Sequence, residues 1–291
     1  MIAIDWGTTS FRAYRLAPDG KVLESRSAPK GILAVPPGGF PAVLDTELGE
    51  WIKEAPIVMS GMVGSRQGWV EAPYVPCPAG FEEIAAAVRE VRKGLWIVPG
   101  VSCLDGVPDV MRGEEVQVLG AGVDGLICLP GTHSKWVEVK GGRIERFSTH
   151  MTGELYAVLR QHSILGRMME EGEPDARAFR DGVERSGEAG GLLHHLFGVR
   201  TRGLMGALGP AASASYLSGL LIGHEMRSCA ATEVSLLGAP ELTKLYETCA
   251  TVLGIEARTL DPQAGVRALF RLGAMLGPSQ GGPAWPLRSP R

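Results

Sequence analysis

Two short Gly-Thr segments hold the residues whose types and spacing are best suited to chemistry. Gly7-Thr8-Thr9-Ser10 and Gly131-Thr132-His133-Ser134 each follow an apolar, strand-like run. A tight turn of this kind presents backbone N–H groups and hydroxyls to one side, which is an arrangement that binds anions. Glycine also lets a phosphate approach the backbone, because no Cβ stands in the way. The segments therefore predict two phosphate-binding turns, which together could hold a polyphosphate from two sides.

Asp5 stands two residues before the first turn and is the candidate metal ligand. A carboxylate at the end of a strand, beside a phosphate-binding turn, is well placed to hold Mg²⁺ through water molecules. The competing interpretation is a carboxylate that stabilises the turn by accepting local N–H groups. The adjacent Gly-Thr turn and its repeat favour the metal. The second copy has Leu129-Pro130 at the matching place, so we expect one copy to keep the metal.

The chain repeats itself around these turns. Residues 2–27 and 126–149 each read as an apolar strand, Gly-Thr-x-Ser, a second strand, a glycine-containing turn and a third strand. Alternating helices and strands follow each copy, which is typical of an α/β arrangement with a mixed sheet. We therefore expect a duplicated α/β fold of two domains, with mixed sheets around a central cleft.

The domain boundaries follow from this repeat. We place an N-terminal substrate and phosphate domain at residues 1–112 and a C-terminal nucleotide domain at 113–276, with the last helix, 262–276, able to pack back on the first domain. The Pro- and Gly-rich tail, 277–291, is expected to be flexible. The expected helices cover 40–54, 81–93, 153–162, 176–196, 211–229, 241–253 and 263–276, and the expected later strands cover 57–60, 95–98, 233–237 and 255–259.

Composition excludes several classes of protein. The 291 residues carry a net charge of -3 and are 45% hydrophobic and 21% charged, which favours neither nucleic acid nor an anionic membrane as a partner. The N-terminus lacks a signal-peptide pattern and no apolar stretch is long enough to span a membrane. The five cysteines form no metal-binding or disulfide spacing. Neither a Walker sequence nor a Rossmann glycine pattern is present. We expect a cytoplasmic protein, with a homo-oligomer left open.

Several longer segments make a more specific pattern: Ile4–Thr9, Val58–Gly64 with Gly68-Trp69, Trp96–Gly100, Val110–Glu115, Pro130–Trp136, Met151–Glu154 and Ser218–Gly223. On these segments the chain resembles the 2-dehydro-3-deoxygalactonokinase family of the actin, sugar-kinase and Hsp70 superfamily. The resemblance implies a ribonuclease H-like (actin-like ATPase) fold. It also implies that ATP donates its γ-phosphoryl group to the 6-hydroxyl of a small sugar acid, 2-dehydro-3-deoxy-D-galactonate, in galactonate catabolism.

The same resemblance implies roles at the nucleotide site. Asp5 would hold Mg²⁺, and the β- and γ-phosphates would be contacted by the two turns, through Gly7, Thr8, Thr9, Gly131, Thr132 and His133. Gly238-Ala239 is similar to the adenosine motif of the superfamily, which is usually richer in glycine. A plain strand-to-helix turn is the competing interpretation of that segment.

Glu114 and Glu115 are the candidates for the catalytic base. In related carbohydrate kinases a Gly-Asp pair opens the helix before the second phosphate hairpin, and the Asp takes the proton of the attacking hydroxyl. This chain has Gly113-Glu114-Glu115 there, so Glu114 aligns with that Asp and Glu115 lies one step away. Two first-turn glutamates that only complement the helix dipole remain the alternative.

The substrate-binding candidates lie between the two turns. Ser60, Gly61, Met62 and Gly64 form a glycine-rich loop after a strand, and Arg66 and Arg112 carry the guanidinium groups that a substrate carboxylate requires. Trp69 could pack on the carbon chain, although a tryptophan is more often part of a core.

Three other functions remain open on the sequence. The first is a kinase of the same superfamily that acts on another sugar acid or polyol. The second is a non-catalytic, actin-like ATP-binding switch or regulator, against which Glu114 and Glu115 argue. The third is an acid kinase that forms an acyl phosphate and uses arginines in place of a carboxylate base.

Overall fold

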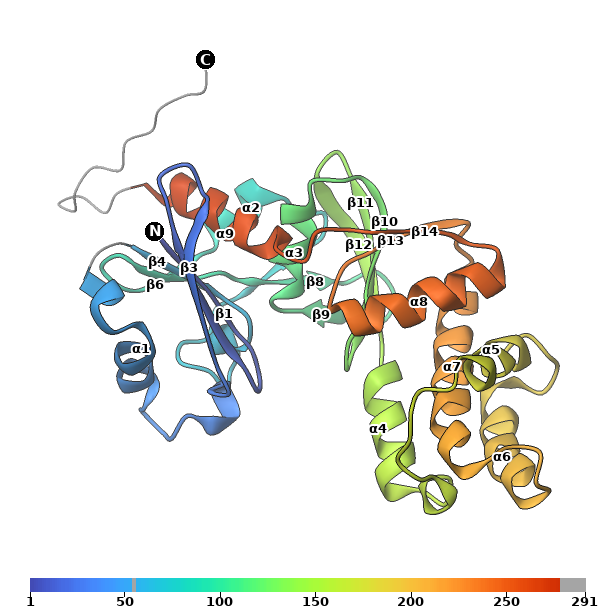
Figure 1. Ribbon diagram of the computed structural model, residues 1–291. Helices are drawn as coiled ribbons and strands as arrows, with labels where there is room; N and C mark the ends of the chain where they lie inside the picture. Colours follow the sequence, from blue (N-terminus) through green and yellow to red (C-terminus); the bar gives the residue numbers. More distant parts are fainter. Residues whose placement is uncertain (54–55, 278–291) are drawn as a thin grey trace. The chain divides into compact units, whose positions relative to one another are not determined.

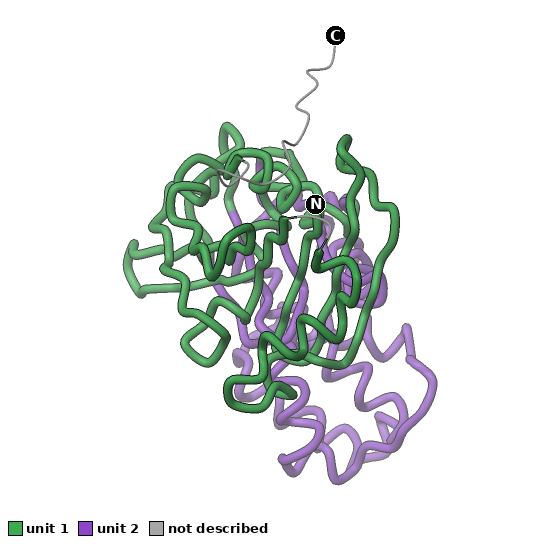
Figure 2. Tube along the Cα trace, turned by 90° about the vertical axis from the view of Figure 1, so that its left-hand side faces the viewer, with its two compact units in different colours: residues 1–124, 138–147, 261–291 green, residues 125–137, 148–260 purple. Residues whose placement is uncertain are grey.

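The computed structural model describes residues 1–53 and 56–277 and divides the chain into two compact units (Figures 1 and 2). Unit 1 comprises Met1–Asp124, Glu138–Phe147 and the chain from Asp261 onward, and unit 2 comprises Gly125–Val137 and Ser148–Leu260. Apart from Gly277, the predicted flexible tail lies outside the described residues.

The C-terminal helix belongs to unit 1. Helix α9 (Ala264–Leu276) contacts β1 and β4 and packs closely against α3 (Glu114–Ala121). At Gly120 the approach is so close that an added Cβ would lie 1.9 Å from the carbonyl oxygen of Ala264. Because α3 is held in unit 1 by this contact, unit 1 continues to Asp124, past the division expected after Arg112.

The larger sheet of unit 1 has the strand order β3-β2-β1-β4-β7-β6. Strands β1 and β2 are antiparallel, as are β2 and β3, whereas β4 pairs in parallel with both β1 and β7. A smaller sheet has the order β5-β8-β9. The bounds of these strands are β1 Ile2–Trp6, β2 Phe11–Leu16, β3 Val22–Ala28, β4 Ile57–Ser60, β5 Tyr74–Pro76, β6 Arg89–Arg92, β7 Leu95–Ile97, β8 Gly100–Cys103 and β9 Asp109–Met111.

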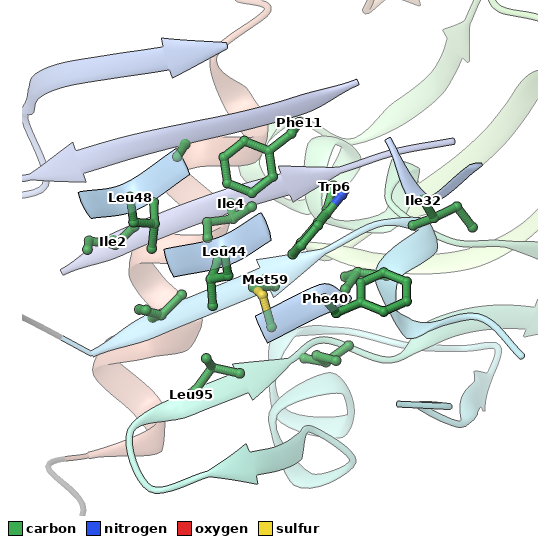
Figure 3. Close-up of a cluster of buried hydrophobic side chains, with 14 of the residues drawn as sticks. Ile2, Ile4, Trp6, Phe11, Ile32, Phe40, Leu44, Leu48, Met59 and Leu95 are labelled. Carbon is green, nitrogen blue, oxygen red and sulfur yellow. The ribbon is translucent and has the colours of Figure 1, made fainter. Parts of the chain in front are cut away.

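One face of the larger sheet builds a hydrophobic core with α1 (Phe40–Leu48), as Figure 3 shows. Ile2, Ile4 and Trp6 alternate along β1 and point to this face, where they join Leu44 and Leu48 of the helix. Their side chains are at most 1% exposed. Alternation places Ala3 and Asp5 on the opposite face, so the core fixes the direction in which Asp5 points.

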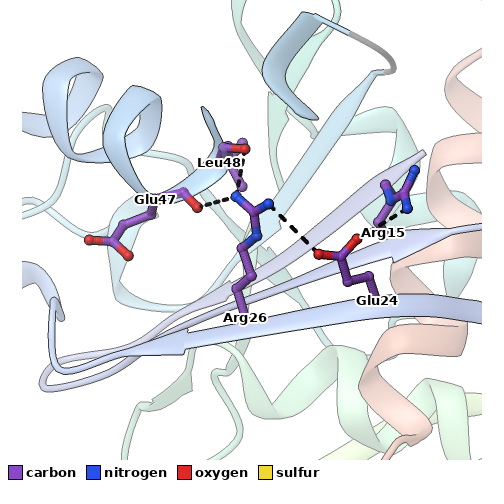
Figure 4. A network of polar contacts seen from close by, with 5 residues as sticks. All are labelled: Arg15, Glu24, Arg26, Glu47 and Leu48. Atoms are coloured by element: carbon purple, nitrogen blue, oxygen red, sulfur yellow. Dashed lines mark hydrogen bonds and ion pairs between the residues drawn. The ribbon is translucent and has the colours of Figure 1, made fainter. Parts of the chain in front are cut away.

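The end of α1 is tied to the sheet by Arg26 of β3 (Figure 4). Its Nη1 donates hydrogen bonds of 3.0 and 2.8 Å to the carbonyl oxygens of Glu47 and Leu48, which belong to the last turn of the helix. Glu24, which pairs with Arg15, also contacts the Arg26 guanidinium. Arg26 therefore supplies the cation that the last turn of α1 lacks.

The five-stranded sheet repeats the strand order of the larger sheet of unit 1; its residues belong to unit 2, except Glu138–Phe147 of β11 and β12, which are part of unit 1. This sheet runs β12-β11-β10-β13-β14, which matches β3-β2-β1-β4-β7 strand for strand, and β13 pairs in parallel with β10 and β14. These strands are β10 Gly125–Leu129, β11 Ser134–Lys140, β12 Arg143–His150, β13 Glu233–Leu236 and β14 Glu256–Thr259. The predicted duplicated α/β fold is confirmed. The cleft expected between the copies stays a prediction.

The helices of unit 2 are α4 Thr152–His162, α5 Ala176–Arg185, α6 Gly191–Leu204, α7 Pro210–Ser228 and α8 Pro240–Leu253. Helix α7 packs against α5, α6, α8 and α4. Short 3₁₀ turns occur in both units, at Ile32–Ala34, Gly49–Lys53, Met62–Gly64 and Gly166–Met168.

Three predicted helices are wrong in part of their length, each near a glycine with positive φ. The helix expected over 40–54 stops at Leu48, because Gly49 has φ 51°. Helix α2 (Phe81–Ala86) is much shorter than expected, since residues 89–92 form β6 and turn at Gly94 into β7. The helix expected over 176–196 is two helices, α5 and α6, separated near Gly190, whose φ is 121°.

None of the helices in residues 1–53 and 56–277 combines the length and the apolar character needed to cross a membrane.

The α3–α9 contact makes a stability prediction. In an open helix Gly→Ala stabilises by about 1 kcal/mol, but Gly120→Ala forces a Cβ into the backbone of Ala264. Overpacking of this kind typically costs about 1–3 kcal/mol, so we expect net destabilisation, read from the urea unfolding midpoint. Gly198→Ala in α6, where a new Cβ meets none of the described residues within 4 Å apart from its chain neighbours and the helix's own backbone, is the control and should stabilise. Equal behaviour of the two variants would contradict the close packing.

Candidate active site

Asp5 lies on β1 beside Arg12 of β2, its direct partner in the antiparallel register. The Arg12 guanidinium Nη1 and the Asp5 carboxylate Oδ2 are 3.3 Å apart. Burial raises the pKa of the Asp5 carboxyl above its ordinary value, Arg12 opposes the rise, and the charge of Glu114 adds to it. The site thus contains a partly buried carboxylate whose charged form would be favoured by a further cation.

Backbone contacts bring the start of α3 to the end of β4. Gly61 directly follows β4, and a Cβ on it would lie 2.8 Å from the carbonyl oxygen of Trp6. A Cβ on Gly113 would lie 3.2 Å from the Cα of Gly61. Both glycines have positive φ, 94° and 109°. These close approaches place Glu114, the first residue of α3, near enough to Asp5 for its charge to act on that carboxyl.

The two glutamates of α3 lie in different environments. Glu114 is partly exposed, and its Oε2 accepts a 3.1 Å hydrogen bond from the backbone N–H of Arg112. Glu115 is fully buried; its Oε2 accepts a 2.6 Å bond from the N–H of Gly113, and its Oε1 has no hydrogen-bond partner among the described residues. Burial, and then the charge of Glu114, raises the pKa of Glu115 to about 8. At neutral pH Glu115 is therefore mainly a neutral carboxyl group.

The first predicted phosphate turn is rigidly supported. The N–H of Gly7 donates to the carbonyl oxygen of Ser10 at 2.9 Å, so this N–H closes the turn and is not offered to a ligand. Ile32 and Leu33 donate to the carbonyl oxygens of Gly7 and Thr8 at 3.0 and 3.2 Å. Thr8 and Thr9 are exposed, and Asp5 lies in the strand that leads into the turn.

The second predicted turn is held by the start of α4. A Cβ on Gly153 would lie 2.4 Å from the carbonyl oxygen of Gly131, and the N–H of Glu154 donates to the carbonyl oxygen of Thr132 at 2.9 Å. The Glu154 carboxylate also contacts Nε2 of His133. Thr132 and His133 remain exposed, so their side chains are accessible to a ligand.

The predicted adenosine segment lies beside the second turn, within unit 2. Gly238 and Ala239 connect β13 to α8, and a Cβ on Gly238 would lie 3.5 Å from the carbonyl oxygen of Pro130. The N–H of Leu237 donates to the carbonyl oxygen of Cys128 at 2.9 Å. Parallel pairing of β10 with β13 therefore brings the nucleoside candidates next to the phosphate candidates.

Arg112 is buried in unit 1, at 8% exposure. Its Nη2 donates to the carbonyl oxygen of Ala72 at 2.7 Å, and its guanidinium lies 4.3 Å from the ring centre of Tyr74. Its Nε and Nη1 have no hydrogen-bond partner among the described residues, and neither has the hydroxyl of Ser60 or Ser65. Buried polar atoms without partners are uncommon in folded proteins and mark places where water or a ligand can bind.

Other substrate candidates lie elsewhere. Arg66 has a side chain that is 89% exposed and pairs with Glu71 at 3.7 Å. Trp69 stacks on Phe40 with ring centres 6.2 Å apart, and Trp69 and Met62 both pack against the core cluster of unit 1. The structure thus gathers Asp5, Ser60, Gly61, Gly64, Arg112 and Glu114 around the ends of β1 and β4, whereas Arg66 points to solvent.

Mg²⁺ fits the donor set of unit 1. In the described part of the chain no group of three or more His, Cys, Asp or Glu residues is arranged to bind a metal. Mg²⁺ does not need such a cage, because proteins usually hold it by one or two carboxylates together with phosphate oxygens and water. Asp5 supplies a carboxylate of that kind.

Sequence reasoning missed three residues of these sites. Arg12 could have been found from the hairpin register, which places it opposite Asp5. Glu154 gave no local signal, because its contact with His133 depends on where α4 begins. Ser65 is a candidate because its buried hydroxyl has no hydrogen-bond partner among the described residues, which the sequence could not show.

Comparison with known proteins identifies the family. The family model of 2-keto-3-deoxy-galactonokinase matches residues 5–272. The "Probable 2-dehydro-3-deoxygalactonokinase" of Rhizobium meliloti (strain 1021) is 40% identical over 286 residues, covering 91% of this chain and 94% of the relative. The 2-dehydro-3-deoxygalactonokinase of Escherichia coli (strain K12) is 38% identical over 283 residues, covering 92% and 96%.

Solved structures agree with this result. The crystal structure of a "putative 2-dehydro-3-deoxygalactonokinase protein" from Sinorhizobium meliloti superimposes with a TM-score of 0.87 at 38% identity. The match covers 94% of this chain and 97% of that one. The activator of 2-hydroxyisocaproyl-CoA dehydratase from Clostridium difficile, with bound ADPNP, has a TM-score of 0.51 at 11% identity, covering 94% of each chain; this similarity concerns the fold alone.

The duplicated sheets and these relatives together define a carbohydrate kinase with an actin-like ATPase fold. Within that class, the chain belongs to the 2-keto-3-deoxy-galactonokinase family.

The environment of Glu115 predicts a pH-dependent stability. Its pKa is raised from 4.5 to about 8, so the stability it contributes is complete below about pH 4.5 and is lost as the pH rises through about 8. Glu115→Gln cannot ionise and should gain on the wild type between these pH values, by at most about 1.4 kcal/mol per pH unit. Urea unfolding across this pH range measures the difference, with the exposed Glu233→Gln as control. A difference that is constant with pH would contradict the buried neutral carboxyl.

Proposed function

We propose that this chain transfers the γ-phosphoryl group of ATP to the 6-hydroxyl of 2-dehydro-3-deoxy-D-galactonate and gives 2-dehydro-3-deoxy-6-phosphogalactonate. The proposal is supported by the names of its relatives, which are 2-dehydro-3-deoxygalactonokinases. The observation that carries it is that Glu114 lies close enough to act on the Asp5 carboxyl through its charge. Both residues lie near the Gly7–Thr9 turn, at the ends of β1 and β4. Since its co-substrate would be the ATP of metabolism, we place the enzyme in the cytoplasm.

The nucleotide contacts follow the two turns. Thr8 and Thr9 in unit 1 and Gly131, Thr132 and His133 in unit 2 are the proposed phosphate ligands, and Gly238 and Ala239 are the proposed adenosine contacts. Gly7, whose N–H closes the turn, would only let a phosphate approach the backbone closely. Asp5 would hold Mg²⁺, which when bound with ATP neutralises phosphate charge. Its partner Arg12 adds a second positive charge beside the first turn.

Glu114 is the proposed general base. The 6-hydroxyl oxygen forms a bond to the γ-phosphorus, the bond from that phosphorus to the bridging oxygen of ADP breaks, and the hydroxyl proton passes to the Glu114 carboxylate. Because phosphoryl transfer has a loose transition state, Glu114 would chiefly orient the hydroxyl and take its proton late. The exposure of Glu114 and the complete burial of Glu115 support this assignment of roles.

Arg112 is the proposed partner of the substrate carboxylate. A carboxylate accepts charge-assisted hydrogen bonds from a guanidinium, and the described residues leave Nε and Nη1 of this group without partners. The bond to Ala72 and the stacking on Tyr74 fix the plane of the group. Nε and Nη1 are both buried in this structure, so a neighbouring segment must move when the acid binds. The side of the substrate site next to Arg112 would be formed by Ser60, Gly61, Met62 and Gly64, and Trp69 would pack behind these residues.

The activity prediction uses the wild type and Glu114→Gln with ATP, Mg²⁺ and a panel of sugar acids and neutral polyols. We expect turnover of 2-dehydro-3-deoxygalactonate, and a fall in kcat of about 10²-fold or more in the variant, because general-base catalysis contributes factors of that size. Glu50→Gln, in the exposed turn that follows α1, is the control.

The same panel separates the alternatives. Turnover of a different acid or polyol would retain the kinase and overturn the substrate. ATP binding without any turnover would favour a non-catalytic switch. Full activity of Glu114→Gln would exclude Glu114 as the base.

Carboxylate recognition is tested with Arg112→Lys, which keeps the charge but loses the planar fork. We expect the KM for the sugar acid to rise about 10- to 100-fold, as the loss of a charge-assisted hydrogen bond implies, while the KM for ATP stays unchanged. Arg66→Lys, whose parent side chain points to solvent, should alter either KM less than about twofold. A larger effect at Arg66 than at Arg112 would reverse the assignment.

A further inference from the structure

A chain of buried hydrogen bonds runs through unit 2 beneath the second turn. Ser134, Trp136, Glu225 and Tyr246 are each at most 4% exposed. The Tyr246 hydroxyl lies 2.9 Å from Oγ of Ser134 and 2.7 Å from Oε2 of Glu225. The indole Nε1 of Trp136 donates to Oε1 of Glu225 at 2.7 Å. The family resemblance gave no role to Ser134, Tyr246 or Glu225, and sequence spacing would not group them.

The direction of the hydrogen bonds is fixed by the acceptor at the end. Tyr246 donates its only proton to the Glu225 carboxylate, so Ser134 must donate to Tyr246. Burial, followed by the charge of Glu225, raises the pKa of Tyr246 above its ordinary value, which keeps the phenol protonated. A buried network of this kind holds its members in one geometry, because leaving any of its polar atoms unpaired is costly.

The ends of the network stand next to the two candidate nucleotide segments. Ser134 begins β11 and directly follows the turn Gly131–His133. Tyr246 lies on α8, which starts directly after Gly238-Ala239. One turn earlier on α8, the hydroxyl of Thr243 donates to the carbonyl oxygen of Ala239 at 3.2 Å. Side-chain hydrogen bonds and helix α8 therefore connect the nucleoside segment to the phosphate turn.

We propose that Ser134, Tyr246 and Glu225 are positioning residues for ATP, which hold the phosphate turn Gly131–His133 at a fixed spacing from the nucleoside segment Gly238-Ala239. This inference rests on the proposed function, since it requires that ATP bind to both segments. A ligand that spans two preset sites does not have to order them on binding. Loss of the spacing should therefore weaken only ligands that bind to both.

The experiment compares Tyr246→Phe with the wild type by calorimetry, using ATP, adenosine and inorganic tripolyphosphate as separate probes. We expect the Kd for ATP to rise about tenfold, because phenylalanine removes both hydrogen bonds of the Tyr246 hydroxyl. The Kd values for adenosine and tripolyphosphate, which each need one segment, should stay within about twofold. The KM for ATP should rise with the Kd, while the KM for the sugar acid stays constant.

The chain offers a matched control. Tyr216 on α7 is also buried, and its hydroxyl has no hydrogen-bond partner in the described part of the chain. Tyr216→Phe should leave all three Kd values unchanged. Ser134→Ala breaks the same network with a smaller side chain, so it serves if Tyr246→Phe folds poorly. The double variant with Tyr246→Phe and Ser134→Ala should have a Kd for ATP no higher than the higher of the two single-variant values, because both substitutions break the same hydrogen-bond network.

Each other outcome overturns the inference. Equal weakening of ATP, adenosine and tripolyphosphate would show general damage to unit 2, and unchanged ATP affinity would show that the network does not set the spacing. If either result is found and the wild type turns over the sugar acid, the inference about the network fails but the proposed function stands. A wild type that does not bind ATP would refute both.

Discussion

The parallel pairing of the first and fourth strands is the constraint on which both units depend. Parallel strands emerge at the same edge of a sheet, so the segments that follow them meet there. In unit 1 this pairing sets Asp5 opposite Ser60. In unit 2 it sets Cys128 opposite Leu236, which brings the turn after β10 beside the nucleoside segment after β13. A one-residue slip in unit 1 would turn the Asp5 side chain into the hydrophobic core, and the apolar residues of β1 prevent that slip.

The two units use this frame for different chemistry. Unit 1 places a carboxylate inside the strand before its turn, next to Arg12. Unit 2 has Leu129-Pro130 there, and its acidic group, Glu154, comes from α4 and contacts His133 instead. The serines that end the two Gly-Thr segments have also diverged, since Ser10 is partly exposed and Ser134 is fully buried against Tyr246. Duplication thus preserved the backbone frame, whereas each turn acquired its own supports.

The sequence predicted the frame well because the frame is encoded locally. The strand expected over 57–60 coincides with β4, and the repeat predicted the three consecutive strands that open each copy. Helix lengths were predicted less well near Gly94 and Gly190, where one backbone conformation ends the periodic pattern. The environments of Arg112 and Glu115 could not be read from the sequence. They depend on a chain reversal that brings Ala72 and Tyr74 to Arg112, and on the complete burial of one of two adjacent glutamates.

Buried polar atoms are paired around Glu225 in unit 2 but not around the start of α3 in unit 1. In unit 2 the buried carboxylate of Glu225 accepts from two donors, so this region is complete without a ligand. Near the end of β4 and the start of α3 in unit 1, polar atoms of Ser60, Ser65, Arg112 and Glu115 are buried without partners among the described residues. Each such atom costs about 1–3 kcal/mol, which a fully apolar interior would avoid. A fold that retains this cost beside Asp5 and Glu114 gives a polar ligand more to gain on binding there, because the ligand can complete bonds that the protein alone does not make.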